Sequence, residues 1–85
     1  MTLGNKTREL IAVGASVTAN CQPCLQYHLN KALECGANEQ ECAEAIETGK
    51  AVRKGAAAKM DKFALTLSAA APSDAVTAGE GCGCS

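Results

Sequence analysis

The apolar residues of this chain recur at the spacing of helix turns almost throughout, and no stretch alternates between apolar and polar residues as a half-buried strand does. This pattern predicts an all-α fold. Seventeen of the 85 residues are alanine, and Tyr27 and Phe63 are the only aromatic residues. Because alanine-rich helices bury little surface each, a single core is barely adequate for a chain of this length. We therefore expect the apolar helix faces to continue into contacts between identical subunits.

The composition changes once along the chain, near residue 70. We expect one domain of about four helices over residues 1–70 and a flexible tail over residues 71–85, where the sequence APSDAVTAGEGCGCS is small, polar and rich in glycine. The first helix is predicted at about residues 7–18. Its residues leave hardly any polar face, which predicts a helix buried on most sides.

The next two helices are predicted from the residues at their ends. Asn20 is a suitable N-cap for a second helix, and Pro23 then falls in its first turn, where the missing N–H costs nothing. Gly36 is placed to stop this helix just after Cys35. Asn38 is expected to cap a third helix, with Glu41 completing a capping box.

Glycine predicts the end of the third helix. Gly49 and Gly55 both weaken it, and we expect a break near Gly55 before a fourth helix at about residues 56–70. The packing stripe of the second helix is predicted to consist of three leucines at helical spacing, Leu25, Leu29 and Leu33.

Charge and hydropathy suggest neither a nucleic-acid partner nor a membrane. The formal net charge is −1, and the eight basic residues are spread along the chain. The longest weakly polar run, residues 10–19, is too short to span a bilayer and does not read as a signal peptide. We therefore expect a cytoplasmic protein, in which six cysteines indicate catalysis or metal binding rather than a disulfide framework.

The segment NCQPCLQYH, residues 20–28, holds two cysteines and the only histidine of the chain. In a helix that begins near Cys21, the side chains of Cys21, Cys24 and His28 share one face, and both thiols lie where free backbone N–H groups stabilise a thiolate. Cysteines three apart are within disulfide range, whereas Cys35 lies about 16 Å along the helix from Cys24. The segment would supply a nucleophile, a resolving thiol and a base.

Two other interpretations of this segment stay open. The cysteines are also consistent with two small packing residues beside a packing histidine. Alternatively, Cys21, Cys24 and His28 offer three ligands for zinc, and a tail cysteine the fourth. Haem attachment is excluded, because that motif needs the histidine directly after the second cysteine.

The order Glu9, eleven residues, Cys21, two residues, Cys24, three residues, His28 resembles the signature of the alkylhydroperoxidase D (AhpD-like) branch of the carboxymuconolactone decarboxylase family. The resemblance covers roughly residues 7–70. It implies an all-helical trimer or hexamer that reduces a small hydroperoxide without a bound cofactor. Glu9 would act on His28, which would deprotonate Cys24. Cys21 would then close a disulfide with Cys24, which an external dithiol of thioredoxin or lipoyl type would reduce.

Some assignments stay open beside this resemblance. Glu9 is also consistent with a solvated first-turn glutamate. A lactone decarboxylase, as in the other family branch, is disfavoured because decarboxylation has no use for two adjacent sulfurs. Cys82 and Cys84 in the tail are candidates for binding a soft metal or metalloid, for passing electrons to the Cys21–Cys24 pair, or for an inactive end.

Three residues near these motifs receive structural roles. Cys35 and Cys42 are interpreted as packing cysteines, with pairing to each other or to the tail as the lesser alternative. Tyr27 is expected at a subunit contact or at the rim of a pocket.

Overall fold

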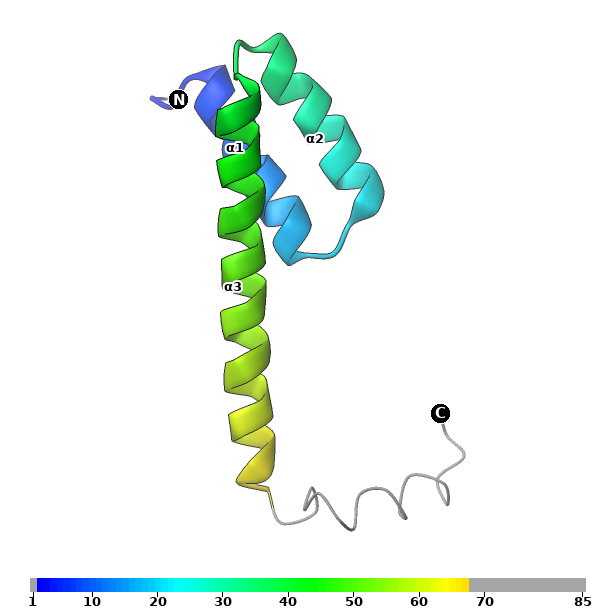
Figure 1. Cartoon of the computed structure of the whole chain (residues 1–85), viewed down its shortest axis with the longest axis vertical. Helices are drawn as coiled ribbons and strands as arrows, with labels where there is room; N and C mark the ends of the chain where they lie inside the picture. Colours follow the sequence, from blue (N-terminus) through cyan, green and yellow to red (C-terminus); the bar gives the residue numbers. More distant parts are fainter. Residues whose placement is uncertain (1, 68–85) are drawn as a thin grey trace. The chain divides into compact units, whose positions relative to one another are not determined.

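A computed structural model of the chain describes residues 2–67, which form the helices α1 (Asn5–Thr18), α2 (Gln22–Glu34) and α3 (Glu39–Leu65) (Figure 1). The all-α prediction is confirmed for these residues, which include no strand. Residues 71–85, the predicted tail with Cys82 and Cys84, lie outside the described part of the chain. The contacts divide the chain after Gly55, so residues 2–55 and 56–67 are described separately.

The predicted break near Gly55 is wrong, and the described residues hold three helices instead of about four. Helix α3 continues through Gly55 to Leu65, and residues 56–65 are its last part. One glycine costs a helix about 1 kcal/mol relative to alanine, and here three alanines follow at once, which are the best helix formers. None of the helices over residues 2–67 is long and apolar enough to cross a membrane.

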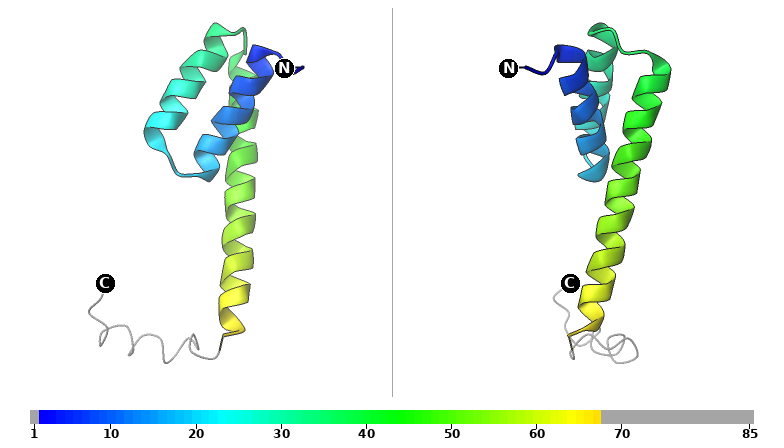
Figure 2. Two further views of the ribbon diagram at one scale, coloured as in Figure 1. Left: turned by 180° about the vertical axis from the view of Figure 1, so that it is seen from behind. Right: turned by 90° about the vertical axis from the view of Figure 1, so that its left-hand side faces the viewer.

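The core of residues 2–55 lies where α1 and α2 pack side by side (Figure 2), and Cys42 from the start of α3 completes it. Its buried members are small, namely Val13, Ala32, Ala37 and Cys42, and the partly buried residues around them include Leu10, Leu25 and Leu29. The predicted stripe of α2 is therefore present in its first two leucines. Leu33 is 45% exposed, so its place in the stripe was wrong.

Helix α1 is less buried than its sequence predicts. Val13, Ser16 and Val17 are its buried residues, whereas Ile11 is 57% exposed and Ala15 is also exposed. The expectation of a helix buried on most sides is therefore not met within the single chain. The exposed side of α1 is apolar surface that the described residues 2–67 leave uncovered.

Two glycines allow α1 and α3 to approach closely. Gly49 is buried, and a Cβ atom there would collide with the carbonyl oxygen of Gly14 and lie 3.0 Å from the Cβ of Val17. The Thr18 hydroxyl lies within hydrogen-bond distance of the carbonyl oxygens of Gly14 (3.1 Å) and Gly49 (3.0 Å). The glycine that weakens α3 as an isolated helix is thus required by the packing of α3 on α1.

The turn between α2 and α3 follows the predicted chemistry. Gly36 has a φ of 101°, a left-handed conformation that glycine adopts readily at the end of a helix. The Asn38 Oδ1 atom accepts the N–H of Glu41 (2.7 Å), and Glu41 Oε1 accepts the N–H of Asn38 (3.0 Å). The predicted capping box is therefore confirmed. Lys6 on α1 adds an ion pair of 3.2 Å to the Glu41 carboxylate.

Candidate redox site

Cys21, rather than Asn20, caps the first turn of α2. Asn20 has a φ of 58° and lies just beyond Ala19, the C-cap of α1, in the left-handed conformation that asparagine tolerates. Cys21 is extended, and its Sγ atom accepts the N–H of Cys24 at 3.3 Å. The prediction of Asn20 as N-cap was wrong by one residue. Pro23 does fall in the first turn, as predicted.

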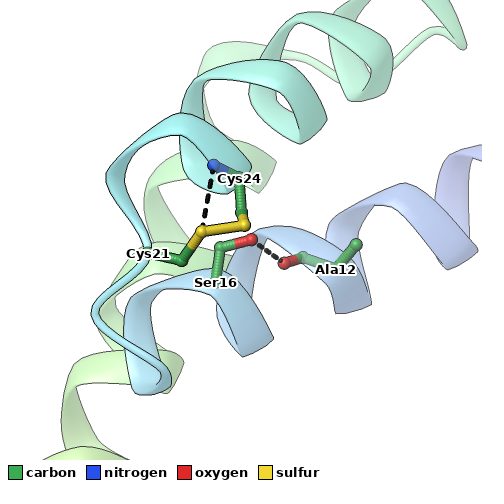
Figure 3. Close-up of a disulfide and its surroundings, with 4 residues drawn as sticks. All are labelled: Ala12, Ser16, Cys21 and Cys24. Carbon is green, nitrogen blue, oxygen red and sulfur yellow. Dashed lines mark hydrogen bonds between the residues drawn. A yellow bond between two sulfur atoms is a disulfide. The ribbon is translucent and has the colours of Figure 1, made fainter.

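Cys21 and Cys24 form a disulfide at this first turn (Figure 3). Their Cα atoms are 5.3 Å apart, within the range that a disulfide requires. Cys24 is exposed to solvent, and Cys21 is half-buried. The N–H of Cys21 donates to the backbone oxygen of Ser16 (3.0 Å), so the last turn of α1 holds the start of α2 in place.

The hydroxyl of Ser16, near the end of α1, has a hydrogen-bond partner on its own helix. Its side chain is buried and donates to the carbonyl oxygen of Ala12 at 2.7 Å, as Figure 3 shows. A buried hydroxyl with a hydrogen-bond partner avoids the cost of an unsatisfied polar group. Ser16 is therefore buried without an unsatisfied polar atom.

His28 lies one turn after Cys24 and pairs with Glu9 on α1. Its Nδ1 atom is 2.8 Å from Glu9 Oε1, and the side chains of His28 and Glu9 are 31% and 26% exposed. When Nδ1 carries the proton and donates to the carboxylate, Nε2 is the basic atom of the neutral ring. The arrangement leaves a proton acceptor on the helix that carries the cysteines.

Tyr27 lies beside His28 on α2. It is 57% exposed and meets the His28 ring edge-on, with centroids 5.0 Å apart and an interplanar angle of 83°. The Lys31 ammonium lies 5.7 Å from the centre of the Tyr27 ring. Its predicted place at a subunit contact or at the rim of a pocket stays a prediction.

The other two cysteines of residues 2–67 differ in their surroundings. Cys42 is 5% exposed and belongs to the core, as predicted. Cys35 is exposed and free, so its interpretation as a packing residue was wrong.

A metal site finds no support in this part of the chain. Among residues 2–67, no three side chains of His, Cys, Asp or Glu are arranged to hold a metal ion. Cys21 and Cys24 are bonded to each other, and zinc binds the free thiolate form. The tail cysteines proposed as further ligands lie outside the described residues.

Arg53 is a neighbour of the site that the motif did not include. Its Nη1 atom donates to Asn20 Oδ1 (2.8 Å) and to the carbonyl oxygen of Val17 (3.2 Å), at the turn that precedes Cys21. Arg53 is separated from Asn20 by 33 positions, so no local motif joins them. The one available signal is its place four positions after Gly49, which puts both residues on one face of α3.

The helical fold and the first-turn cysteine pair define an all-α protein whose site is compatible with redox chemistry. A model of the carboxymuconolactone decarboxylase family matches residues 2–71, and the chain belongs to this family. The family expected from the motif is therefore confirmed, while the match does not specify a branch. Neither a curated protein nor a solved structure matches the chain.

Proposed function

We propose that the protein is a thiol-dependent peroxidase of the AhpD-like branch, an enzyme that reduces a small hydroperoxide at the Cys21–Cys24 pair. The observation that carries the proposal is the disulfide at the start of α2, combined with the Glu9–His28 pair between α1 and α2. The family also includes decarboxylases, for which two bonded sulfurs have no evident use.

Proton transfer opens the cycle. Nε2 of His28 accepts the proton of the Cys24 thiol, while Glu9 holds Nδ1–H and stabilises the imidazolium that forms. The free N–H groups at the start of α2 favour the thiolate. Cys24 is the exposed member of the pair and is placed to meet a peroxide from solvent.

Two sulfur reactions then follow. The Cys24 thiolate attacks the O–O bond, which gives Cys24 sulfenic acid, while the alcohol leaves with the proton held by His28. The Cys21 thiol attacks the sulfenic sulfur, water leaves, and the observed disulfide forms. An external dithiol returns two electrons and two protons, so the cycle uses no bound cofactor. This demand for dithiols agrees with work in the cytoplasm, where thiols are kept reduced.

We also propose that the working form is a homo-oligomer, a trimer or a hexamer. An open apolar hollow of about 470 Å³ lies between α1 and α3 within residues 2–55, lined in part by Ile11, Ala15 and Val52. Ile11 and Val52 are 57% and 55% exposed. A subunit contact over this hollow would bury the apolar side of α1 that residues 2–67 leave exposed.

Cysteine substitutions test the proposed activity. Peroxide consumption is followed with dithiothreitol as donor, and Cys24→Ser is expected to lower the rate by about 1,000-fold or more, because a serine hydroxyl is not ionised at neutral pH. In a separate measurement without any donor thiol, Cys21→Ser is expected to consume one equivalent of peroxide and to hold a sulfenic acid that dimedone traps. Cys35→Ser, which changes an exposed free thiol, is the matched control. A fully active Cys24→Ser enzyme overturns the proposal.

A further inference from the structure

Arg53 lies near Cys21, the less exposed member of the disulfide pair. It shares with Cys21 a hollow of about 190 Å³, whose walls also include Asn20, Gln22 and Leu25. Cys24 is not among the residues that line this hollow. A molecule that enters it therefore reaches Cys21 rather than Cys24.

Only one nitrogen of the Arg53 guanidinium, Nη1, is engaged in hydrogen bonds within residues 2–67. Its Nη1 atom is engaged by Asn20 and Val17, both neutral groups. Over residues 2–67, no carboxylate lies within ion-pair distance of Arg53, and neither Nε nor Nη2 has a hydrogen-bond acceptor. A guanidinium offers five N–H donors in a plane that matches a carboxylate, so an anion can bind the free edge while Nη1 stays in place.

We propose that Arg53 is a specificity-determining residue for the electron donor, and that it directs a dithiol carrying an anionic group to the Cys21 sulfur. The inference rests on the proposed function, because it assigns the donor side of that cycle. The positive end of α2 lies at the same turn and acts in the same direction as Arg53. Leu25 supplies an apolar wall for the carbon chain of the donor.

The direction of attack has a chemical consequence. The first donor thiolate attacks Sγ of Cys21, the S–S bond breaks, and Cys24 leaves as a thiolate. The second donor thiolate attacks the donor's own sulfur in the mixed disulfide, which releases Cys21 as a thiolate and a cyclic donor disulfide. The two protons of the dithiol end on the protein thiols. Cys24 is thus the first sulfur freed, on the side where the peroxide is expected.

The test compares dihydrolipoate with dihydrolipoamide, which share one dithiol and differ in a carboxylate against an amide. The rate of disulfide reduction is measured on the oxidised full chain, without peroxide, at low ionic strength. We expect dihydrolipoate to react roughly 5-fold faster than the amide, with the preference lost in Arg53→Gln and in high salt. Arg53→Lys, which keeps the charge, retains part of it. Lys54→Gln, the same charge change on an exposed neighbour, retains all of it.

Each remaining outcome decides against the inference. Equal rates for the two donors overturn it, as does a preference that survives Arg53→Gln. Should Arg53→Gln fail to fold, a preference in the unaltered protein that high salt leaves unchanged overturns it instead. The attacked sulfur is mapped with 3-mercaptopropionate and acid quenching, followed by alkylation of the released thiol. The adduct is expected on Cys21, and an adduct on Cys24 contradicts the assignment.

This experiment separates the donor site from the peroxidase activity. Donor preference is measured before any peroxide is added, and the reduced protein is then tested for peroxide consumption. A donor preference without peroxide consumption overturns the proposed function but leaves the role of Arg53. Peroxide consumption without a donor preference overturns the role of Arg53 but leaves the proposed function.

Discussion

Glu9 on α1 and His28 on α2 are joined by a hydrogen bond of 2.8 Å between Oε1 and Nδ1, although 19 positions separate them in the sequence. The bond fixes which ring nitrogen faces the carboxylate, and so leaves the other nitrogen as the base. The bond also joins α1 to α2, the helix that begins with the cysteine pair. The proton acceptor and the sulfurs therefore share one small framework.

Removing the charge of Glu9 is expected to slow peroxide reduction. Glu9→Gln keeps a side chain of the same shape but loses the carboxylate that stabilises imidazolium, and the rate of peroxide consumption should fall by about 100-fold. Glu44→Gln, an exposed change on α3, is the control. An unchanged rate in Glu9→Gln would remove Glu9 from the mechanism.

The two glycines of α3 are expected to respond in opposite directions to alanine. Gly49→Ala places a Cβ atom against the Gly14 backbone and should lower the free energy of unfolding by about 2–4 kcal/mol. Gly55→Ala meets no atom within 4 Å and should raise it by about 0.5–1 kcal/mol, through helix propensity alone. Urea denaturation measures both. Equal effects of the two changes would contradict the close contact of α1 and α3.

Glu41 is expected to give the fold a pH dependence. Its pKa is lowered, first by the hydrogen bond from the Asn38 backbone and then by Lys6. A lowered pKa in the folded state means that the ionised carboxylate stabilises the fold above the ordinary glutamate pKa of about 4.3. This contribution is lost as the pH falls through the lowered pKa.

The measurement for Glu41 is the thermal midpoint of the chain and of Glu41→Gln against pH. The glutamine variant should melt at a lower temperature at neutral pH, and the two midpoints should converge in acid, where Glu41 is protonated. Glu47→Gln, farther along α3, serves as the control. A midpoint difference that persists unchanged into acid would show that the charge of Glu41 is not the cause.

The apolar hollow between α1 and α3 predicts the assembly state. Light scattering with size-exclusion chromatography should give a mass of several 8.6 kDa chains, and Ile11→Asp should yield a smaller species, since it places a charge in the contact. Ala43→Asp puts the same charge on an exposed position of α3 and should leave the assembly intact. A monomer before any substitution would contradict the oligomer.

The helix ends that depend on hydrogen bonds between neighbouring residues were predicted from the sequence. The stop at Gly36 and the box of Asn38 with Glu41 follow from hydrogen bonds within a few residues, and both are present. Asparagine is suited both to the left-handed position after one helix and to the N-cap of the next helix. The identity of Asn20 alone therefore does not decide between these two positions. The N-cap of α2 is Cys21, whose Sγ atom accepts the hydrogen bond from the N–H of Cys24.

The features that sequence reasoning missed depend on contacts between distant segments. Gly49 looks like a helix breaker until α1 is packed against it. Arg53 acquires its place beside the cysteine turn through residues more than thirty positions away. The Glu9–His28 contact was expected mainly from the family resemblance, because the spacing of single residues on two helices does not specify which faces meet.

Cys21 combines two duties in one atom, because its sulfur both holds the first turn of α2 and belongs to the reactive pair. Reduction of the disulfide changes how strongly the Cys21 sulfur accepts the hydrogen bond from the N–H of Cys24. The NMR signal of this backbone amide therefore reports the oxidation state of the pair. Mutagenesis must respect the same overlap. Serine preserves the helix start while removing the sulfur chemistry, whereas alanine removes both and mixes their effects.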